Sequence, residues 1–78
     1  MLRKDTVLRI LDDGGMLTWN TLSDCAHVWT GTEHRGCYPL RFAKALSRSG
    51  KFYVRTTSRT VYGRLVFFTV LSKEAFHG

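Results

Sequence analysis

The chain has 78 residues, of which 44% are hydrophobic and 23% charged, and its net charge is +6. This length allows one domain (residues 1–78) with a modest core, and the apolar content excludes a disordered chain. Arg9, Asp12 and Asp13 interrupt the first apolar run, which argues against a signal peptide, and no stretch is long enough to span a membrane. We therefore expect a cytoplasmic protein with free thiols.

The charge is unevenly divided along the chain. Residues 1–34 hold three Lys or Arg against five acids, a net charge of −2. Residues 35–78 hold nine Lys or Arg against Glu74 alone, a net charge of +8. This asymmetry predicts a polyanionic partner for the second half of the chain, most often a nucleic acid.

The first predicted element is a helix over residues 5–13. Val7, Leu8, Ile10 and Leu11 form one apolar stripe, Asp5 is available as its cap, and a pair of glycines follows. The segment "MLT" after those glycines is long enough for only a short extended pairing.

A second helix is predicted after Thr18. Trp19, Leu22, Ala26 and Trp29 fall at i, i+3, i+7 and i+10, which would place them on one apolar face and make both tryptophans core residues. "TGTEHRG" then reads as a loop.

The third predicted helix covers residues 39–49. Pro39 suits the first turn of a helix, and Gly50 suits its end. Arg41, Lys44 and Arg48 form a stripe opposite the apolar side, and the segment contains no acid to pair with them. These three cations therefore form a candidate binding surface.

Residues 52–71 predict a β-hairpin. The segment is rich in β-branched and aromatic residues and lacks proline, so we expect strands at 52–57 and 64–71 around the turn "SRTVYG". Phe76 is expected to dock on the core. Because "LVFFTVL" is more apolar than one side of a ribbon requires, a homodimer that buries part of it is one expectation.

The order of three helices and a hairpin resembles the winged helix-turn-helix family. The segments that carry the resemblance are "LSDCAHVW" as positioning helix, "YPLRFAKALSRSG" as recognition helix and "FYVRTTSRTVYGRLVFFTVL" as wing. The connection between the second and third helices is longer than the tight turn of a simple helix-turn-helix. The fold class expected from this resemblance is α+β, a three-helix winged helix-turn-helix with a C-terminal hairpin wing.

Two cysteines and two histidines lie within "DCAHVWTGTEHRGC". If Cys25 and His27 are helical, they lie about 200° apart around the axis and cannot chelate one ion, so we expect no metal. A Cys25–Cys37 disulfide is disfavoured in the expected compartment, and a Cys–His nucleophile lacks an orienting group. The stretch is therefore interpreted as a joint between helices, with Cys25 near the core and both histidines on the surface.

Together these patterns predict a non-enzymatic DNA-binding protein without a cofactor, a transcriptional regulator or a phage or mobile-element accessory factor. Helix 39–49 would enter the major groove of double-stranded DNA, and hairpin 52–71 would contact the backbone. The predicted contact residues are Tyr38, Arg41, Lys44, Ser47, Arg48, Arg55, Ser58, Arg59, Tyr62 and Arg64. One alternative is a module that binds a host protein. Another is RNA or single-strand binding by stacking on Tyr38, Tyr53 or Tyr62. No membrane or small-molecule partner is expected.

Overall fold

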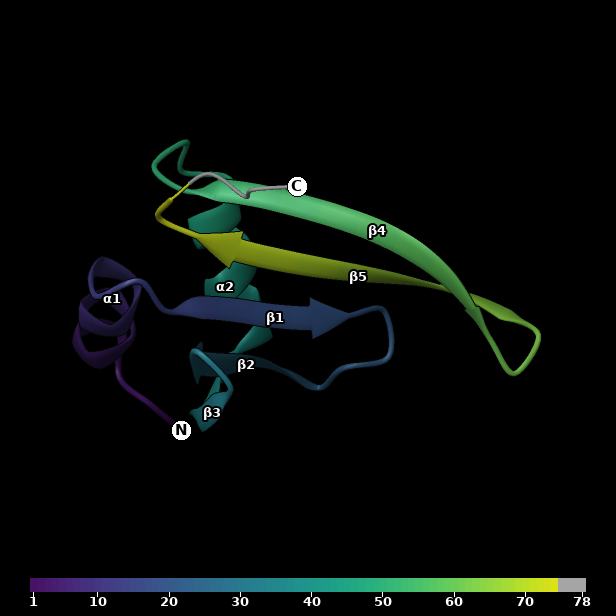
Figure 1. The fold of residues 1–78 in the computed structure, drawn as a ribbon, viewed down its shortest axis with the longest axis horizontal. Coiled ribbons are helices and arrows are strands. Elements are labelled where there is room, and N and C mark those ends of the chain that lie inside the picture. The colour runs from purple at the N-terminus through teal and green to yellow at the C-terminus, as the bar shows by residue number, and fades with distance from the viewer. Residues whose placement is uncertain (75–78) are drawn as a thin grey trace.

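The computed structural model describes residues 1–74, and Figure 1 shows the arrangement of its helices and strands. Two helices and five strands follow one another along the chain. They are α1 (Lys4–Asp12), β1 (Met16–Asn20), β2 (Cys25–Thr30), β3 (Glu33–Pro39), α2 (Leu40–Ser47), β4 (Tyr53–Val61) and β5 (Arg64–Ser72).

The five strands form one antiparallel sheet in the order β3-β2-β1-β5-β4. Helix α2 crosses behind the sheet in Figure 1, and α1 packs beside β1 and β2. Both helices contribute to a core that also contains Leu17, Val28 and Leu71 from the strands. The sheet therefore has a helix-covered face and an open face, and the open face is turned toward the viewer in Figure 1.

Alternating burial explains why β1 and β2 are strands. Leu17 and Trp19 point into the core from β1, and Ala26 and Val28 do so from β2, while their neighbours are half-buried on the open face. Such a period of two is the signature of a strand with one buried face.

The predicted winged helix-turn-helix is therefore wrong, because the fold is a five-stranded sheet with two helices. The segment assigned to the second helix forms β1, a turn and β2 instead. Leu22, which the helical stripe placed in the core, is 62% exposed in that turn. The Ser23 Oγ accepts a hydrogen bond from the Asn20 amide at 3.0 Å, and the Asn20 side chain accepts one from the Leu22 amide at 2.8 Å. These local bonds stabilise the turn.

The other predicted elements lie near their expected places. Helix α1 falls within one residue of the prediction, although Asp5 lies in its first turn and makes no cap hydrogen bond. Helix α2 begins at Leu40 directly after Pro39 and ends before Gly50, which has a φ of 77°. "MLT" begins the central strand β1, and the expected loop "TGTEHRG" belongs to the β2–β3 hairpin. Phe76 lies outside the described residues.

The predicted hairpin at residues 52–71 is confirmed as β4 and β5, with a tighter turn than expected. Tyr62 and Gly63 both have positive φ, 49° and 77°, and they join the strands as a two-residue turn. The hairpin is not a separate wing, because β5 pairs with β1 from Met16↔Ser72 to Asn20↔Phe68. Its distal half projects beyond the rest of the sheet in Figure 1.

In the described part of the chain, neither helix has the length and apolar character needed to cross a membrane.

Candidate functional site

The predicted contact residues lie on two opposite sides of the sheet. Arg41, Lys44 and Arg48 are exposed on α2, on the helix-covered side. Arg55 and Arg59 stand opposite Val70 and Val66 in the hairpin, and these positions face the open side. The fold therefore does not place a recognition helix and a wing on one surface.

Several of the remaining predicted residues have other surroundings. Tyr38 is 2% exposed and packs in the core, with its ring 5.9 Å from that of Phe42, so it offers no stacking surface. The Ser47 hydroxyl donates to the Lys44 carbonyl oxygen at 2.6 Å. Ser58 pairs with Phe67 and faces the helix-covered side.

The hairpin turn carries two more predicted residues. Tyr62 is fully exposed at the tip, and Arg64 is the exposed first residue of β5. The described core lies at the other end of the hairpin, and Arg64, two residues before Val66, shares the open face with that residue.

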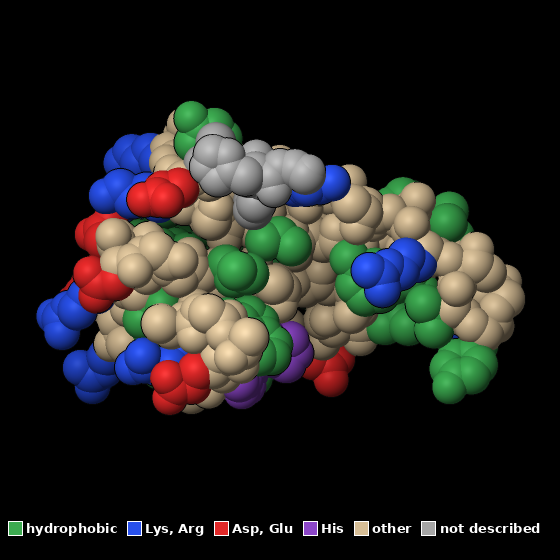
Figure 2. Space-filling model, in the orientation of Figure 1, with side chains coloured by type: hydrophobic (Ala, Val, Ile, Leu, Met, Phe, Trp, Pro, Cys, Tyr) green, Lys and Arg blue, Asp and Glu red, His purple; other side chains and the backbone are tan. Residues whose placement is uncertain are grey.

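On the open face, cations and aromatic rings come together across the hairpin. Arg55, Thr57 and Arg59 occupy alternate positions of β4, so their side chains share this face. The Arg59 guanidinium lies over the ring of Phe68 on β5, 5.5 Å from its centroid. Figure 2 shows the open face, with a cationic side chain lying against hydrophobic ones on the projecting hairpin.

Beside this pair, the open face is hollowed into a groove of about 280 Å³. Thr18 and Asn20 of β1 lie on its floor with His27 of β2, and Phe68 and Val70 of β5 form the side next to the hairpin. These residues meet because Thr18 pairs with both His27 and Val70 in the sheet register. The groove thus combines hydroxyl, amide and imidazole groups with apolar walls.

The part of the open face formed by β1, β4 and β5 carries positive charge only. Strands β1, β4 and β5 contain no Asp or Glu. Among residues 1–74 the single ion pair joins Lys73 to Asp12 at 2.6 Å. Arg55 and Arg59 are therefore free of carboxylate partners within the described residues.

Trp29 is a residue of this face that the sequence interpretation placed in the core. It is half-buried on the open side, and its Nε1 donates to the Thr18 hydroxyl at 2.8 Å. The core prediction is confirmed for Trp19, which is 8% exposed. Alternation along β2 is the signal that separates Trp29 from buried Val28.

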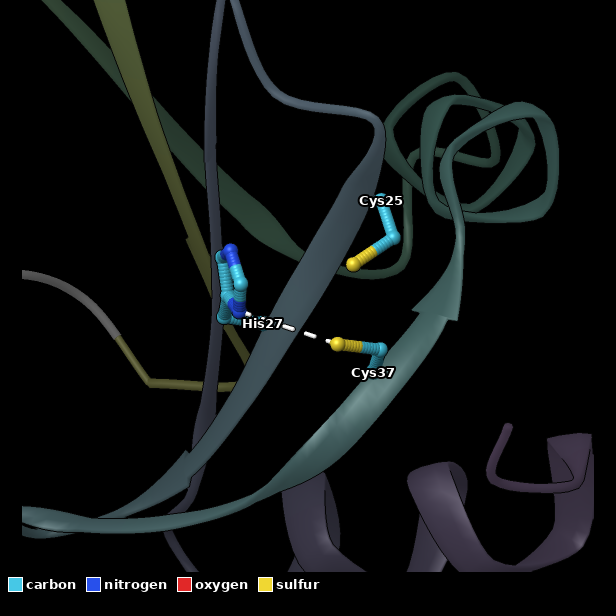
Figure 3. A group of neighbouring side chains, drawn as sticks. All are labelled: Cys25, His27 and Cys37. Atoms are coloured by element: carbon cyan, nitrogen blue, oxygen red, sulfur yellow. Dashed lines mark hydrogen bonds between the residues drawn. The ribbon is translucent and has the colours of Figure 1, made fainter.

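The Cys–His stretch folds into the β2–β3 hairpin instead of a joint between helices. Cys25 and His27 are two residues apart on β2 and share the open face, and Cys37 lies opposite His27 on β3. The geometric reason for expecting no metal, a separation of about 200° around a helix, therefore does not apply. Figure 3 shows the three side chains pointing toward one another.

Contacts within this group are short. Cys37 Sγ lies 3.8 Å from His27 Nδ1, and the ligand atoms of Cys25, His27 and Cys37 all lie within 4.8 Å of one another. The Nε2 atom of His34 lies 3.1 Å from His27 Nδ1. The hydrogen bond with Cys37, with a smaller contribution from burial, raises the pKa of the Cys25 thiol to about 11.

Comparisons with protein-family models, with curated proteins and with solved structures found no match to this chain.

Proposed function

We propose that the chain is a non-enzymatic nucleic-acid-binding protein, and that a single strand lies across its open sheet face. The observation that carries the proposal is the stacking of the Arg59 guanidinium on Phe68, beside Arg55 and a polar groove. The proposal retains a cytoplasmic location and needs no cofactor for binding.

Charge supports a polyanionic ligand on this face. Arg55 and Arg59 lie in a part of the sheet whose strands carry no acid. Each cation that contacts a phosphate releases a counterion, which makes binding favourable at low salt. Thr57 lies between the two arginines and adds a hydroxyl that can bind a phosphate oxygen.

Stacking supports a single strand over a duplex. Proteins that bind single strands combine a cationic track with aromatic rings or guanidinium planes on which unpaired bases stack. Phe68 is half-buried with Arg59 over its ring, and Trp29 lies further along the same face. Bases in a duplex are already stacked on one another and cannot use these surfaces.

The division of the cations argues against the duplex arrangement expected from the sequence. The α2 stripe of Arg41, Lys44 and Arg48 lies on the side opposite Arg55 and Arg59. A rigid duplex docked on α2 would leave the open-face arginines without a phosphate. This pair of surfaces provides a matched control.

The experiment is fluorescence anisotropy with labelled single-stranded DNA, single-stranded RNA and duplex DNA over a range of salt concentrations. Arg55→Ala and Arg59→Ala should each weaken single-strand binding and reduce the salt slope by about 0.7. Phe68→Ala should weaken binding by about 1–3 kcal/mol, the usual contribution of one stacked base. Arg41→Ala and Arg48→Ala remove the same charge from the other side and should change binding much less.

A stronger effect of Arg41→Ala and Arg48→Ala, together with preference for duplex, would contradict the open-face proposal and favour docking through α2. Failure to bind any of the three nucleic acids at low ionic strength would contradict nucleic-acid binding altogether, and would favour a host protein as the partner.

A further inference from the structure

The open face carries a second cluster whose chemistry differs from that of the arginine and aromatic surface. It consists of Cys25, His27 and Cys37, with His34 next to His27. Two thiols and two imidazoles at the same place are not needed for packing, because the core lies on the other face of the sheet. Their donor atoms are the sulfur and nitrogen types that bind zinc.

Strand geometry explains how three of these side chains meet. Cys25 and His27 occupy alternate positions of β2, so both point to the open face. The register places Cys37 directly opposite His27. Cross-strand neighbours of this kind have Cβ atoms only about 4.5–5.5 Å apart, close enough for both side chains to reach one ion.

An irregularity in the pairing brings in the fourth side chain. His34 and Cys37 are three residues apart, which would place them on opposite faces of a regular strand. The register shifts between Val28 and Trp29, so that Val28 pairs with Gly36 but Trp29 pairs with His34. Arg35 is the extra residue, and the bulge returns His34 to the face of Cys37.

The distances within the group of Cys25, His27 and Cys37 are close to those of a tetrahedral ion, whereas His34 lies outside this group and completes the site only when its side chain turns toward the cysteines. Zinc bonds of about 2.3 Å to sulfur and about 2.0–2.1 Å to nitrogen place neighbouring ligand atoms about 3.3–3.8 Å apart at tetrahedral angles. The Cys37 Sγ to His27 Nδ1 distance is 3.8 Å, and the His27 Nδ1 to His34 Nε2 distance is 3.1 Å. Cys25 Sγ lies within 4.8 Å of the other two ligand atoms in its group, so its side chain must move closer to them as the ion binds.

Neighbouring side chains support the exposed histidine. The rings of Trp29 and His34 meet in a T-shaped contact with centroids 5.0 Å apart, and the Thr18 hydroxyl accepts a hydrogen bond from the indole. Contacts of this kind orient metal ligands and contribute to affinity.

We propose that Cys25, His27, Cys37 and His34 bind one zinc ion, which joins β2 to β3 on the open face. As the ion binds, each thiol releases its proton to solvent and each histidine contributes a neutral nitrogen. Two thiolates balance the charge of the ion, so the occupied site is neutral. Because the core is complete without it, the ion strengthens the hairpin and is not required for folding.

The test is a titration of the reduced protein with Zn²⁺ in competition with a coloured chelator, and with Co²⁺ as a spectroscopic substitute. We expect one equivalent to bind, with thiolate-to-cobalt charge-transfer absorption and visible bands of tetrahedral intensity. Mg²⁺, which prefers oxygen ligands, should not compete. Far-UV circular dichroism before and after chelation should be unchanged, while the melting temperature rises with Zn²⁺.

Variants locate the site. Cys25→Ser, Cys37→Ser and His27→Ala should each lower the affinity at least about 100-fold, because even residues around a metal's ligands typically contribute 10–100-fold. His34→Ala should weaken binding and change the visible cobalt bands, because a water replaces one nitrogen. Asp24→Asn, next to Cys25, is the matched control for adventitious carboxylate binding and should bind as the wild type does.

Three results would overturn the proposal: no cobalt charge-transfer band in the folded wild type, equal affinity in the wild type and Cys37→Ser, or loss of binding in Asp24→Asn. Circular dichroism would identify any substitution at a proposed ligand that prevents folding. In that case the titration of the wild type alone tests whether the protein binds zinc.

Discussion

The half of the sheet beneath the helices and the distal half of the β4–β5 hairpin have the same antiparallel pairing but very different surroundings. In the first, Leu17, Val28 and Leu71 are completely buried against α1 and α2. In the second, no described helix covers the strands, and Leu65 and Phe67 are 61% and 47% exposed on the side that faces the helices elsewhere. Strand pairing therefore stabilises most of the distal hairpin, where Val66 at 2% exposed is a buried exception, while burial stabilises the rest of the sheet.

This difference indicates where the molecule can bind a ligand at little cost to its stability. Residues of the helix-covered half are constrained by packing on one face, and only their open-face neighbours are free to take part in binding. In the distal hairpin nearly every side chain is exposed, so arginines and hydroxyls occupy it without disturbing the core.

The largest expected effect comes from a matched pair of leucines. Leu17→Ala removes a completely buried side chain from the central strand and should cost about 2–5 kcal/mol of unfolding free energy. Leu65→Ala makes the same change in the exposed hairpin and should stay within about 0.5 kcal/mol of the wild type. Urea denaturation measures both. Equal costs would mean that the hairpin is as tightly packed as the core.

A smaller contrast is expected between two glycines. A Cβ at Gly15 would lie 2.6 Å from the Trp29 carbonyl oxygen and 2.7 Å from that of Ile10, so backbone must move in Gly15→Ala, at a cost of about 1–3 kcal/mol. Gly63 has open space around it but a φ of 77°, so Gly63→Ala should cost only about 1 kcal/mol from conformational strain. Thermal melts would rank the two variants, and the reverse order would contradict this account.

The smallest effect at neutral pH is expected for Tyr38→Phe. Burial raises the pKa of the Tyr38 phenol, so the folded state holds the proton more tightly than the unfolded chain does. Its contribution to stability is complete below the ordinary tyrosine pKa of about 10 and is lost as the pH rises through the folded value. Wild type should therefore lose more stability than Tyr38→Phe between neutral pH and pH about 11. Parallel curves in urea titrations across that range would argue against the assignment.

The sequence was sufficient to predict α1, α2 and the hairpin, because each has a strong local signal. Pro39 and Gly50 bracket α2, and β-branched residues fill β4 and β5. The segment from Thr18 to Trp29 was misassigned because Trp19, Ala26 and Trp29 fit a helical period by coincidence. The shorter alternation within β1 and β2 becomes decisive only when their pairing with β5 and β3 is known.

The candidate site was predicted only in part, because its residues are visible in the sequence but their arrangement depends on how the strands pair. The unpaired cations of residues 35–78 were visible in the sequence, but their division between two sides of a sheet depends on the strand order. The convergence of Cys25, His27 and Cys37 requires the β2–β3 register, and the placement of His34 beside them requires its bulge; no spacing rule contains either. The homodimer stays a prediction, which sedimentation at micromolar concentration would test. Leu71 of the apolar segment "LVFFTVL" is completely buried within the monomer, so less apolar surface is left for a second copy.

The pairing of β1 with β5 has a consequence for how the chain folds. The β2–β3 and β4–β5 hairpins pair strands that are neighbours in the sequence. The pairing of Met16 with Ser72, in contrast, joins residues from opposite ends of the chain. Loop closure makes such a long-range contact slow, so we expect the seam between β1 and β5 to form last. During synthesis on the ribosome, the β1 edge therefore stays unpaired until residue 72 has emerged. In that interval the nascent chain exposes a strand edge that can associate with other chains.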